Sequence, residues 1–197
     1  MTLNFPQIYL ASNSPRRREL LSQIGVDFSV LSVDVDESIL PNEQADDYVK
    51  RVAIAKAQAG WNSLNQTEKK PVLGSDTSVV LAGDILGKPG DNEHAREMLL
   101  RLSGQQHQVM TAVAIMTAEK TWLELNTSTV TFAKLSKEDI DWYLSTTEGV
   151  DKAGGYAVQG LAALFIEKIE GSYSGIMGLP LRETGLLLTH IAGQTDE

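Results

Sequence analysis

The sequence predicts an α/β fold built on a mixed β-sheet. Segments with strand-like and helix-like patterns alternate along the chain, which is typical of that class. Two long β-rich stretches, 107–117 and 121–133, are joined by a short polar turn, and such a hairpin requires an antiparallel pair. The length of 197 residues and the hydrophobic content of 42% fit one domain, or two small lobes around a shared cleft.

In the first half of the chain, apolar and β-branched runs predict the strands, and capping residues delimit the helices. Ser14 is a good N-cap, Pro15 a good first helical residue and Gly25 a C-terminal stop. In chain order, the expected elements are a strand at 8–11, a helix at 15–24, a strand at 28–35, a helix at 44–59, a loop at 62–70, a strand at 71–81 and, after a turn at 82–84, a short strand at 85–86.

The second half carries clearer helix signals. Asp91 is a predicted N-cap, and the helix after it stops near Gly104. Ser136, followed three residues later by Asp139, resembles a capping box. The remaining expected elements are strands at 107–117 and 121–133, a helix from 136 to 144, a glycine-rich loop at 152–160, a strand at 161–169 and a helix at 182–191.

Composition excludes several functions. A formal net charge of −9 argues against a surface that coats a nucleic acid polymer, although a small anionic ligand needs only a local positive patch. The chain has no cysteine, which excludes disulfide scaffolds, thiolate metal sites and cysteine nucleophiles. Residues 1–7 lack the pattern of a signal peptide, and no run approaches the ~20 apolar residues that span a bilayer. We therefore expect a cytoplasmic protein without membrane contact.

Basic residues open the first predicted helix, where acidic ones are favoured. The first turn of a helix carries partial positive charge, yet here it holds Arg16, Arg17 and Arg18. An anion bound at this turn would be held by backbone N–H groups, the helix dipole and guanidinium groups together. The segment therefore predicts an anion site, with ordinary solvated arginines as the alternative.

Two further charges lie where apolar residues are expected. Asp76 interrupts an apolar, β-branched strand, where a carboxylate is costly unless it is paired, hydrogen-bonded or bound to metal. Lys56 shares the apolar face of the helix at 44–59 with Val49, Val52 and Ala53. The alternatives are a structural aspartate at a bulge marked by Gly74, and a lysine that snorkels from the edge of the stripe.

Three weaker candidates lie in predicted loops. Lys88 is held in Gly87-Lys-Pro89, and Glu37 ends an acidic run; both types of residue are usually solvated. Gln159 belongs to the glycine-rich loop, whose glycines allow close backbone approach to a ligand. Its amide can both donate to and accept from a planar base edge, although the loop could also be merely flexible.

No motif for covalent catalysis is present. The three histidines are scattered without metal-ligand spacing, and the chain has no Walker A, Gly-x-Ser-x-Gly or dinucleotide fingerprint. Two carboxylates and several cations remain, a combination that suits metal-assisted hydrolysis of a phosphate ester or anhydride.

Six segments, taken together and in order, resemble the Maf family of nucleotide pyrophosphatases. They are Ala11-Ser-Asn-Ser-Pro-Arg-Arg-Arg-Glu-Leu-Leu21, Gly74-Ser-Asp-Thr77, Gly87-Lys-Pro89, Leu102-Ser-Gly104, Lys152-Ala-Gly-Gly-Tyr-Ala-Val-Gln-Gly160 and Gly178-Leu-Pro-Leu181. The likeness implies one Maf-like domain over 1–197, in which two lobes flank a deep central cleft. It also implies an elongated, curved mixed sheet flanked by helices, like that of inosine triphosphatases.

The resemblance implies an enzyme that hydrolyses a nucleoside triphosphate to the monophosphate and pyrophosphate, in the branch that acts on dTTP and UTP. It is compatible with a homodimer. Asp76 matches the family's proton acceptor, and Arg16, Thr77 and Gln159 match positions that set base choice. Further active-site positions are matched by Ser12, Arg17, Glu37, Lys56 and Lys88.

The resulting hypothesis is attack of water on the α-phosphorus, with Asp76 orienting or deprotonating the water. Glu37 and Asp76 would hold Mg²⁺ or Mn²⁺. Ser12 is grouped with the phosphate-binding cations, which are Arg16, Arg17, Lys56 and Lys88. Two alternatives stay open: a base other than thymine or uracil, such as 7-methyl-GTP or a modified pyrimidine nucleotide, and a non-enzymatic nucleotide-binding regulator of cell division.

Overall fold

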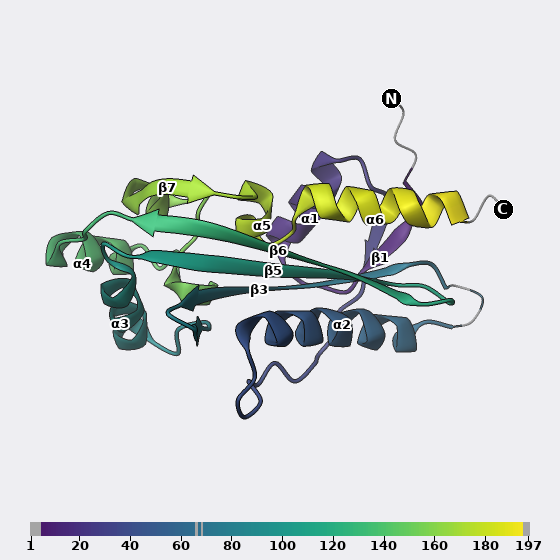
Figure 1. Cartoon of the computed structure of the whole chain (residues 1–197), viewed down its shortest axis with the longest axis horizontal. Coiled ribbons are helices and arrows are strands. Elements are labelled where there is room, and N and C mark those ends of the chain that lie inside the picture. Colours follow the sequence, from purple (N-terminus) through teal and green to yellow (C-terminus); the bar gives the residue numbers. More distant parts are fainter. Residues whose placement is uncertain (1–4, 66, 68, 195–197) are drawn as a thin grey trace.

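The fold consists of one long β-sheet with helices on both faces (Figure 1). The computed structural model describes residues 5–194 except 66 and 68. The strands are β1 (Ile8–Leu10), β2 (Phe28–Val30), β3 (Val72–Leu81), β4 (Asp84–Leu86), β5 (Gln106–Met116), β6 (Thr121–Phe132) and β7 (Ile166–Glu170). The helices are α1 (Pro15–Gln23), α2 (Ala45–Ser63), α3 (Asn92–Leu102), α4 (Lys137–Ser145), α5 (Tyr173–Met177) and α6 (Leu181–Gln194).

The sheet is mixed and spans two lobes. Within the described residues its order is β2-β1-β3-β5-β6-β7, with β4 paired to β3. The pairs of β1 with β2 and β3 are parallel, and the pairs along β3, β5, β6 and β7 are antiparallel. The long strands β3, β5 and β6 connect a lobe that carries α1, α2 and α6 to a lobe that carries α3, α4 and β7 (Figure 1). The predicted two-lobed α/β class is confirmed.

Three clusters of buried side chains hold the layers together. Under α2, small residues such as Ala53 and Ala57 pack on β5 residues Ala112 and Ala114. On the other face of that lobe, leucines and isoleucines from β1, α1 and α6 form the second cluster. The third fills the far lobe around Phe132 and includes aromatic residues from α4 and the glycine-rich loop. None of the helices in the described part of the chain has the length and apolar character needed to cross a bilayer.

The predicted helix ends are largely confirmed. The carboxylate of Asp91 accepts from the N–H of His94, and Ser136 with Asp139 forms the capping box. Gly25 adopts φ +72° directly after the first helix, as its stop position requires. Ser14 occupies the N-cap of α1 but its side chain makes no capping hydrogen bond; instead its N–H donates to Ser12 Oγ at 3.2 Å.

Three predicted elements have wrong boundaries, and one helix was not predicted. The strand expected at 28–35 ends at Val30, and the helix expected to end at 59 continues to Ser63, into the predicted loop at 62–70, of which residues 66 and 68 lie outside the described set. The short helix α5 is absent from the predicted elements. The first half of the strand expected at 161–169 is a 3₁₀ helix, η3 (Leu161–Phe165), because the carboxylate of Glu148 accepts hydrogen bonds from the N–H groups at its start.

One edge of β3 is left open at its centre. β1 pairs with Val72 and Leu73, and β4 pairs with 79–81, so no described strand pairs with 74–78 along this edge. Gly74 lies at the start of the gap, against α2. A Cβ there would lie 2.4 Å from the carbonyl oxygen of Ala53 and 2.5 Å from the amide nitrogen of Ala57, so only glycine lets the helix pack this closely.

A buried histidine makes the stability of the far lobe depend on pH. His107 on β5 is 2% exposed, its Nε2 lies 2.8 Å from the hydroxyl of Tyr156, and its Nδ1 has no hydrogen-bond partner among the described residues. Burial lowers the pKa of His107 to about 4. Between pH 6.5 and 4 the unfolded chain therefore binds a proton that the folded chain does not, and stability falls as the pH falls.

We expect the His107→Gln variant to lose this pH dependence. For the wild type, His107 should remove up to about 3 kcal/mol of unfolding free energy between pH 7 and pH 4. Glutamine keeps a hydrogen-bonding group near Tyr156 but does not titrate. Urea unfolding at a series of pH values measures the difference, and equal slopes for the two proteins would contradict the assignment.

Candidate active site

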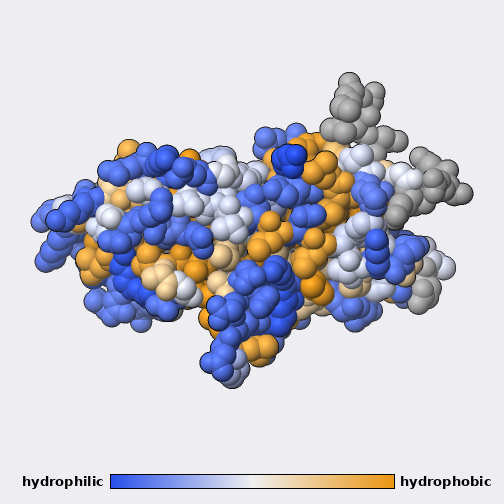
Figure 2. Space-filling view, in the orientation of Figure 1, coloured by the Kyte–Doolittle hydropathy of each residue, from blue (hydrophilic) through white to orange (hydrophobic). Residues whose placement is uncertain are grey.

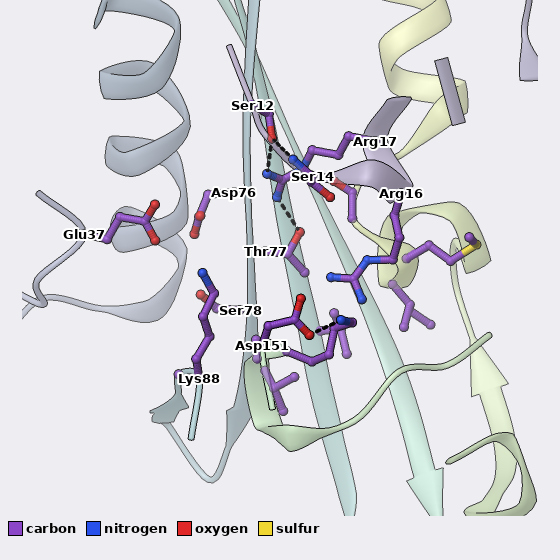
Figure 3. Close-up of a pocket in the computed structure, with 18 of the residues that line it drawn as sticks. Ser12, Ser14, Arg16, Arg17, Glu37, Asp76, Thr77, Ser78, Lys88 and Asp151 are labelled. Atoms are coloured by element: carbon purple, nitrogen blue, oxygen red, sulfur yellow. Dashed lines mark hydrogen bonds and ion pairs between the residues drawn. The ribbon is translucent and has the colours of Figure 1, made fainter. Parts of the chain in front are cut away.

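A cleft of about 980 Å³ opens at the gap in the edge of β3. The structure brings all the predicted site residues into its lining, and Figure 3 labels most of them. They are Ser12, Arg16, Arg17, Glu37, Lys56, Asp76, Thr77, Lys88 and Gln159. Arg18, the third arginine of the predicted anion site, is exposed and is not part of this lining.

The alternation of β3 divides the site into two clusters. Successive side chains of a strand point to opposite faces of the sheet. Asp76 points toward α2, whereas Thr77 points toward α1 and the C-terminal part of the chain. Because the edge is unpaired at these residues, both clusters reach the same cleft.

The first cluster, here the carboxylate cluster, consists of Lys56, Asp76 and Glu37. Lys56 Nζ lies 2.8 Å from Asp76 Oδ1 and 2.8 Å from Glu37 Oε1. Asp76 is 6% exposed and the Lys56 side chain 11% exposed, whereas that of Glu37 is 42% exposed. Pairing offsets the cost of burying Asp76, and Lys56 is an ion-pair partner rather than a lysine that snorkels into solvent.

Glu37 comes from the segment that precedes α2. This segment is mostly hydrophilic on the face shown in Figure 2, although Ile39 and Leu40 are exposed. The backbone carbonyl of Glu37 accepts a hydrogen bond from the hydroxyl of Tyr48 at 2.9 Å, which fixes the segment to the helix. Partial burial opposes ionisation of Glu37, but the hydrogen bond and charge of Lys56, with help from Lys88 and Arg17, hold its pKa below the usual value. Burial and the nearby carboxylates of Asp76 and Glu37 raise the pKa of Tyr48 to about 12.

The second cluster, here the arginine cluster, is centred on Arg17. Its Nε donates to the carbonyl oxygen of Gly178 at 2.8 Å, Nη1 to Ser12 Oγ at 3.2 Å and Nη2 to Thr77 Oγ1 at 3.3 Å. Thr77 Oγ1 also accepts from Thr111 on the neighbouring strand at 3.0 Å. Burial lowers the pKa of Arg17, against the opposing charge of Asp76, but a guanidinium still stays protonated. The cluster therefore presents a fixed positive charge.

Arg16 and Lys88 extend the positive charge along the cleft. Arg16 points across it toward Asp151, which lies before the glycine-rich loop (Figure 3). Burial lowers the pKa of Arg16, and the charges of Asp151 and Glu19 act in the opposite direction. Among the described residues neither Arg16 nor Lys88 forms an ion pair within 4 Å, so both are available to an anion.

The glycine-rich loop forms the far wall of the cleft. Gly154 and Gly155 adopt φ +68° and +73°, which turns the loop back beneath the cleft. After this turn, Tyr156 and Val158 are buried, while Gln159 is exposed within the cleft lining. A polar amide therefore stands at the mouth of a largely apolar wall, an arrangement suited to a flat heterocycle.

Several residues of the site were not predicted. Asp151 lines the cleft and directly precedes the glycine-rich loop in the sequence; this adjacency is the only feature of the sequence that points to it. The carbonyl oxygen of Gly178 holds both Arg17 and Ser75 Oγ, at 2.8 and 3.1 Å. A backbone acceptor has no side-chain signature, although its segment belongs to one of the matched motifs. Thr111 gave no signal at all.

The carboxylate cluster fits a divalent cation bound together with phosphate. In the described part of the chain, no group of three or more His, Cys, Asp or Glu side chains could hold a metal ion alone. Glu37 and Asp76 supply two carboxylates on one side of the cleft, both held by Lys56. Mg²⁺ is commonly bound by one or two carboxylates with substrate phosphates completing its shell.

Similar proteins are found by family model, among curated proteins and among solved structures. A family model described as Maf-like protein matches residues 7–191. A protein of Nitrosospira multiformis named dTTP/UTP pyrophosphatase is 50% identical over 98% of both chains. One of the same name from Nitrosomonas europaea is 52% identical over 92% of both. The solved structure of the Staphylococcus aureus Ham1 protein is 18% identical, with a TM-score of 0.47 over 73% of this chain and 98% of that one.

The pairing of Lys56 with both Asp76 and Glu37 can be tested without any ligand. In the Lys56→Met variant we expect the pKa of Glu37 to rise above its wild-type value, because burial then acts with less compensation. Titration of the glutamate side-chain carbons by NMR measures this. Lys50→Met is the matched control, since Lys50 lies on the same helix and pairs with Asp46 instead. An unchanged Glu37 titration in Lys56→Met would show that the pairing is absent in solution.

Proposed function

Because the chain belongs to the Maf-like protein family, we propose that it is a nucleoside triphosphate pyrophosphatase that hydrolyses dTTP and UTP to the monophosphate and pyrophosphate. The names of relatives at about 50% identity over nearly the full length support this substrate pair. The observation that carries the proposal is the meeting of Asp76 with the basic groups of the cleft, opposite a loop that presents Gln159.

The distribution of charge orients the substrate. The triphosphate is favoured near Arg17, Lys56 and Lys88, because their positive charges offset the negative charges of the phosphates. The base then points toward Gln159 and the apolar wall of the glycine-rich loop. Ser12, whose hydroxyl accepts a hydrogen bond from Arg17, belongs to the phosphate end. Arg16 points across the cleft toward Asp151 (Figure 3).

We propose that Asp76 is the general base. It accepts a proton from a water molecule, whose oxygen attacks the α-phosphorus. The bond from the α-phosphorus to its bridging oxygen breaks, and pyrophosphate leaves with the electron pair. Arg17 and Lys88 stabilise the charge that develops on the leaving group, and Lys56, which already touches Asp76 and Glu37, keeps both carboxylates beside it.

Glu37 and Asp76 are also proposed to hold a divalent cation, Mg²⁺ or Mn²⁺. When bound, such an ion polarises phosphate oxygens and neutralises part of their charge. Both carboxylates would otherwise repel a polyanion, so their presence beside the phosphate end favours a metal-dependent hydrolase over a protein that only binds nucleotides.

Base choice is proposed to rest on Gln159, Arg16 and Thr77. A glutamine amide can pair with the O4 and N3–H edge that thymine and uracil share. The two substrates differ by one methyl and one hydroxyl group, and an apolar pocket discriminates such groups only ~10–200-fold. Acceptance of both dTTP and UTP follows from that narrow range.

We further propose that 1–197 acts as one Maf-like domain in the cytoplasm, where nucleoside triphosphates are made and used. The continuous sheet through both lobes and the family match over 7–191 support the single domain. Assembly as a homodimer stays a prediction.

The substrate assignment predicts a clear order of activity. With Mg²⁺ present, we expect pyrophosphate release from dTTP and UTP well above that from purine triphosphates and 7-methyl-GTP, and loss of release after chelation with EDTA. A coupled pyrophosphate assay over a nucleotide panel, with product analysis by chromatography, measures both. Preferential cleavage of 7-methyl-GTP, or release of orthophosphate instead of pyrophosphate, would refute the assignment.

The role of Asp76 predicts a large effect on turnover. Asp76→Asn should lower kcat for dTTP by at least about a thousandfold, because loss of one well-placed transition-state group costs ~10²–10³ and this substitution removes the proposed base and a proposed metal ligand together. Asp84→Asn is the control, because this exposed aspartate pairs with Arg101 outside the cleft. Wild-type turnover in folded Asp76→Asn protein would exclude it as the base.

A further inference from the structure

A strained turn connects α4 to the glycine-rich loop. Thr147 adopts φ +60°, a left-handed conformation that is rare and strained for a β-branched residue. Gly149, two residues on, lies so close to the loop that a Cβ would come 2.0 Å from the carbonyl oxygen of Gly155. The turn is therefore packed closely against the loop that carries Gln159.

The main contact is the carboxylate of Glu148. Its Oε2 accepts a hydrogen bond from the backbone N–H of Leu161 at 2.8 Å. Its Oε1 accepts from the N–H of Ala162 at 3.3 Å and from the hydroxyl of Tyr143 at 3.0 Å. The carboxylate thus caps the start of η3 and is itself held by α4.

Glu148 also touches the residue that follows Gln159 in the chain. A Cβ on Gly160 would lie 2.2 Å from Glu148 Oε2, so the absence of a side chain there makes room for the carboxylate. The three residues after Gln159 are thereby all in contact with one carboxylate. Gln159 itself lines the cleft and makes no side-chain hydrogen bond within the described structure, so its place is set by the backbone on either side of it.

We infer that Glu148 is a positioning residue for base selection: by fixing the backbone directly after Gln159, it holds that amide at the base end of the cleft. The inference rests on the proposed function and deepens it. Glu148 does not line the cleft, so it acts through the loop rather than on the nucleotide.

The chemistry of the contact makes a sharp substitution available. A carboxylate only accepts hydrogen bonds, and its partners at Leu161, Ala162 and Tyr143 all donate. Glu148→Gln keeps the size of the side chain but turns one acceptor into an amide NH₂ that faces a donor. The loop should loosen, while the carboxylate and arginine clusters stay intact.

We expect Glu148→Gln to lower the selectivity for dTTP over dCTP, the ratio of the two kcat/KM values, by about tenfold, as leaving a donor unpaired implies. The loss should come mainly from a higher KM for dTTP, with kcat little changed. Gly160→Ala, whose methyl group displaces the Glu148 carboxylate, should give the same loss without altering any charge.

Asp139→Asn is the matched control. Asp139 lies on α4, the helix whose Tyr143 hydrogen-bonds Glu148, and its carboxylate also accepts a backbone N–H; that bond, from Ser136, caps the helix and does not touch the loop. We expect a lower melting temperature and an unchanged selectivity. A destabilised protein with fewer active molecules lowers kcat for all nucleotides equally, so the ratio separates positioning from a merely structural role.

A double-variant cycle completes the test. If Glu148 acts through Gln159, then Glu148→Gln should cause little further loss of selectivity in a Gln159→Ala background. Unchanged selectivity in both Glu148→Gln and Gly160→Ala, or full additivity with Gln159→Ala, would overturn the inference. Failure of the proposed function is distinguishable, because the wild type would then release no pyrophosphate from dTTP or UTP.

Discussion

The arrangement of the site depends on the ion pairs that Lys56 forms with Asp76 and Glu37. A buried aspartate in the middle of a sheet is unstable unless a partner comes close enough to offset its desolvation. Lys56 does so only because α2 packs very near β3, over a floor of alanines and against a glycine at position 74. The small residues of this interface are therefore part of the site, although none of them lines the cleft.

The open edge of β3 explains how one strand serves both halves of the site. Asp76 and Thr77 are neighbours in sequence and point to opposite faces of the sheet, so in a fully paired sheet they would be separated by it. β1 pairs with β3 only as far as Leu73, and β4 pairs with it only from Val79 onward, so residues 74–78 are unpaired along this edge in the described structure. A nucleotide bound in the cleft can then contact the carboxylate cluster on one side and the arginine cluster on the other.

Sequence reasoning recovered the residues whose chemistry conflicts with their surroundings. Asp76 and Lys56 stood out as charges in apolar patterns, and the arginines as cations at a helix start. The motif resemblance added Ser12 and Thr77, whose local patterns predict no function, and it supported Glu37, which the acidic run alone indicated only weakly. What stayed hidden depends on contacts between distant segments. The apolar residues after Gly160 predict a strand, because their local sequence does not indicate that the carboxylate of Glu148 caps this segment. The contact of Arg17 with Gly178 is made by a backbone carbonyl oxygen, which no side-chain pattern predicts.

The fastening of Arg17 has a consequence for synthesis of the chain. Its guanidinium is held by residues 12, 77 and 178, so its three anchors come from the beginning, the middle and the end of the polypeptide. A chain that is still being synthesised on the ribosome lacks the third of these partners until residue 178 has been translated. The phosphate end of the cleft therefore takes its final form only after the segment around Gly178 has been made.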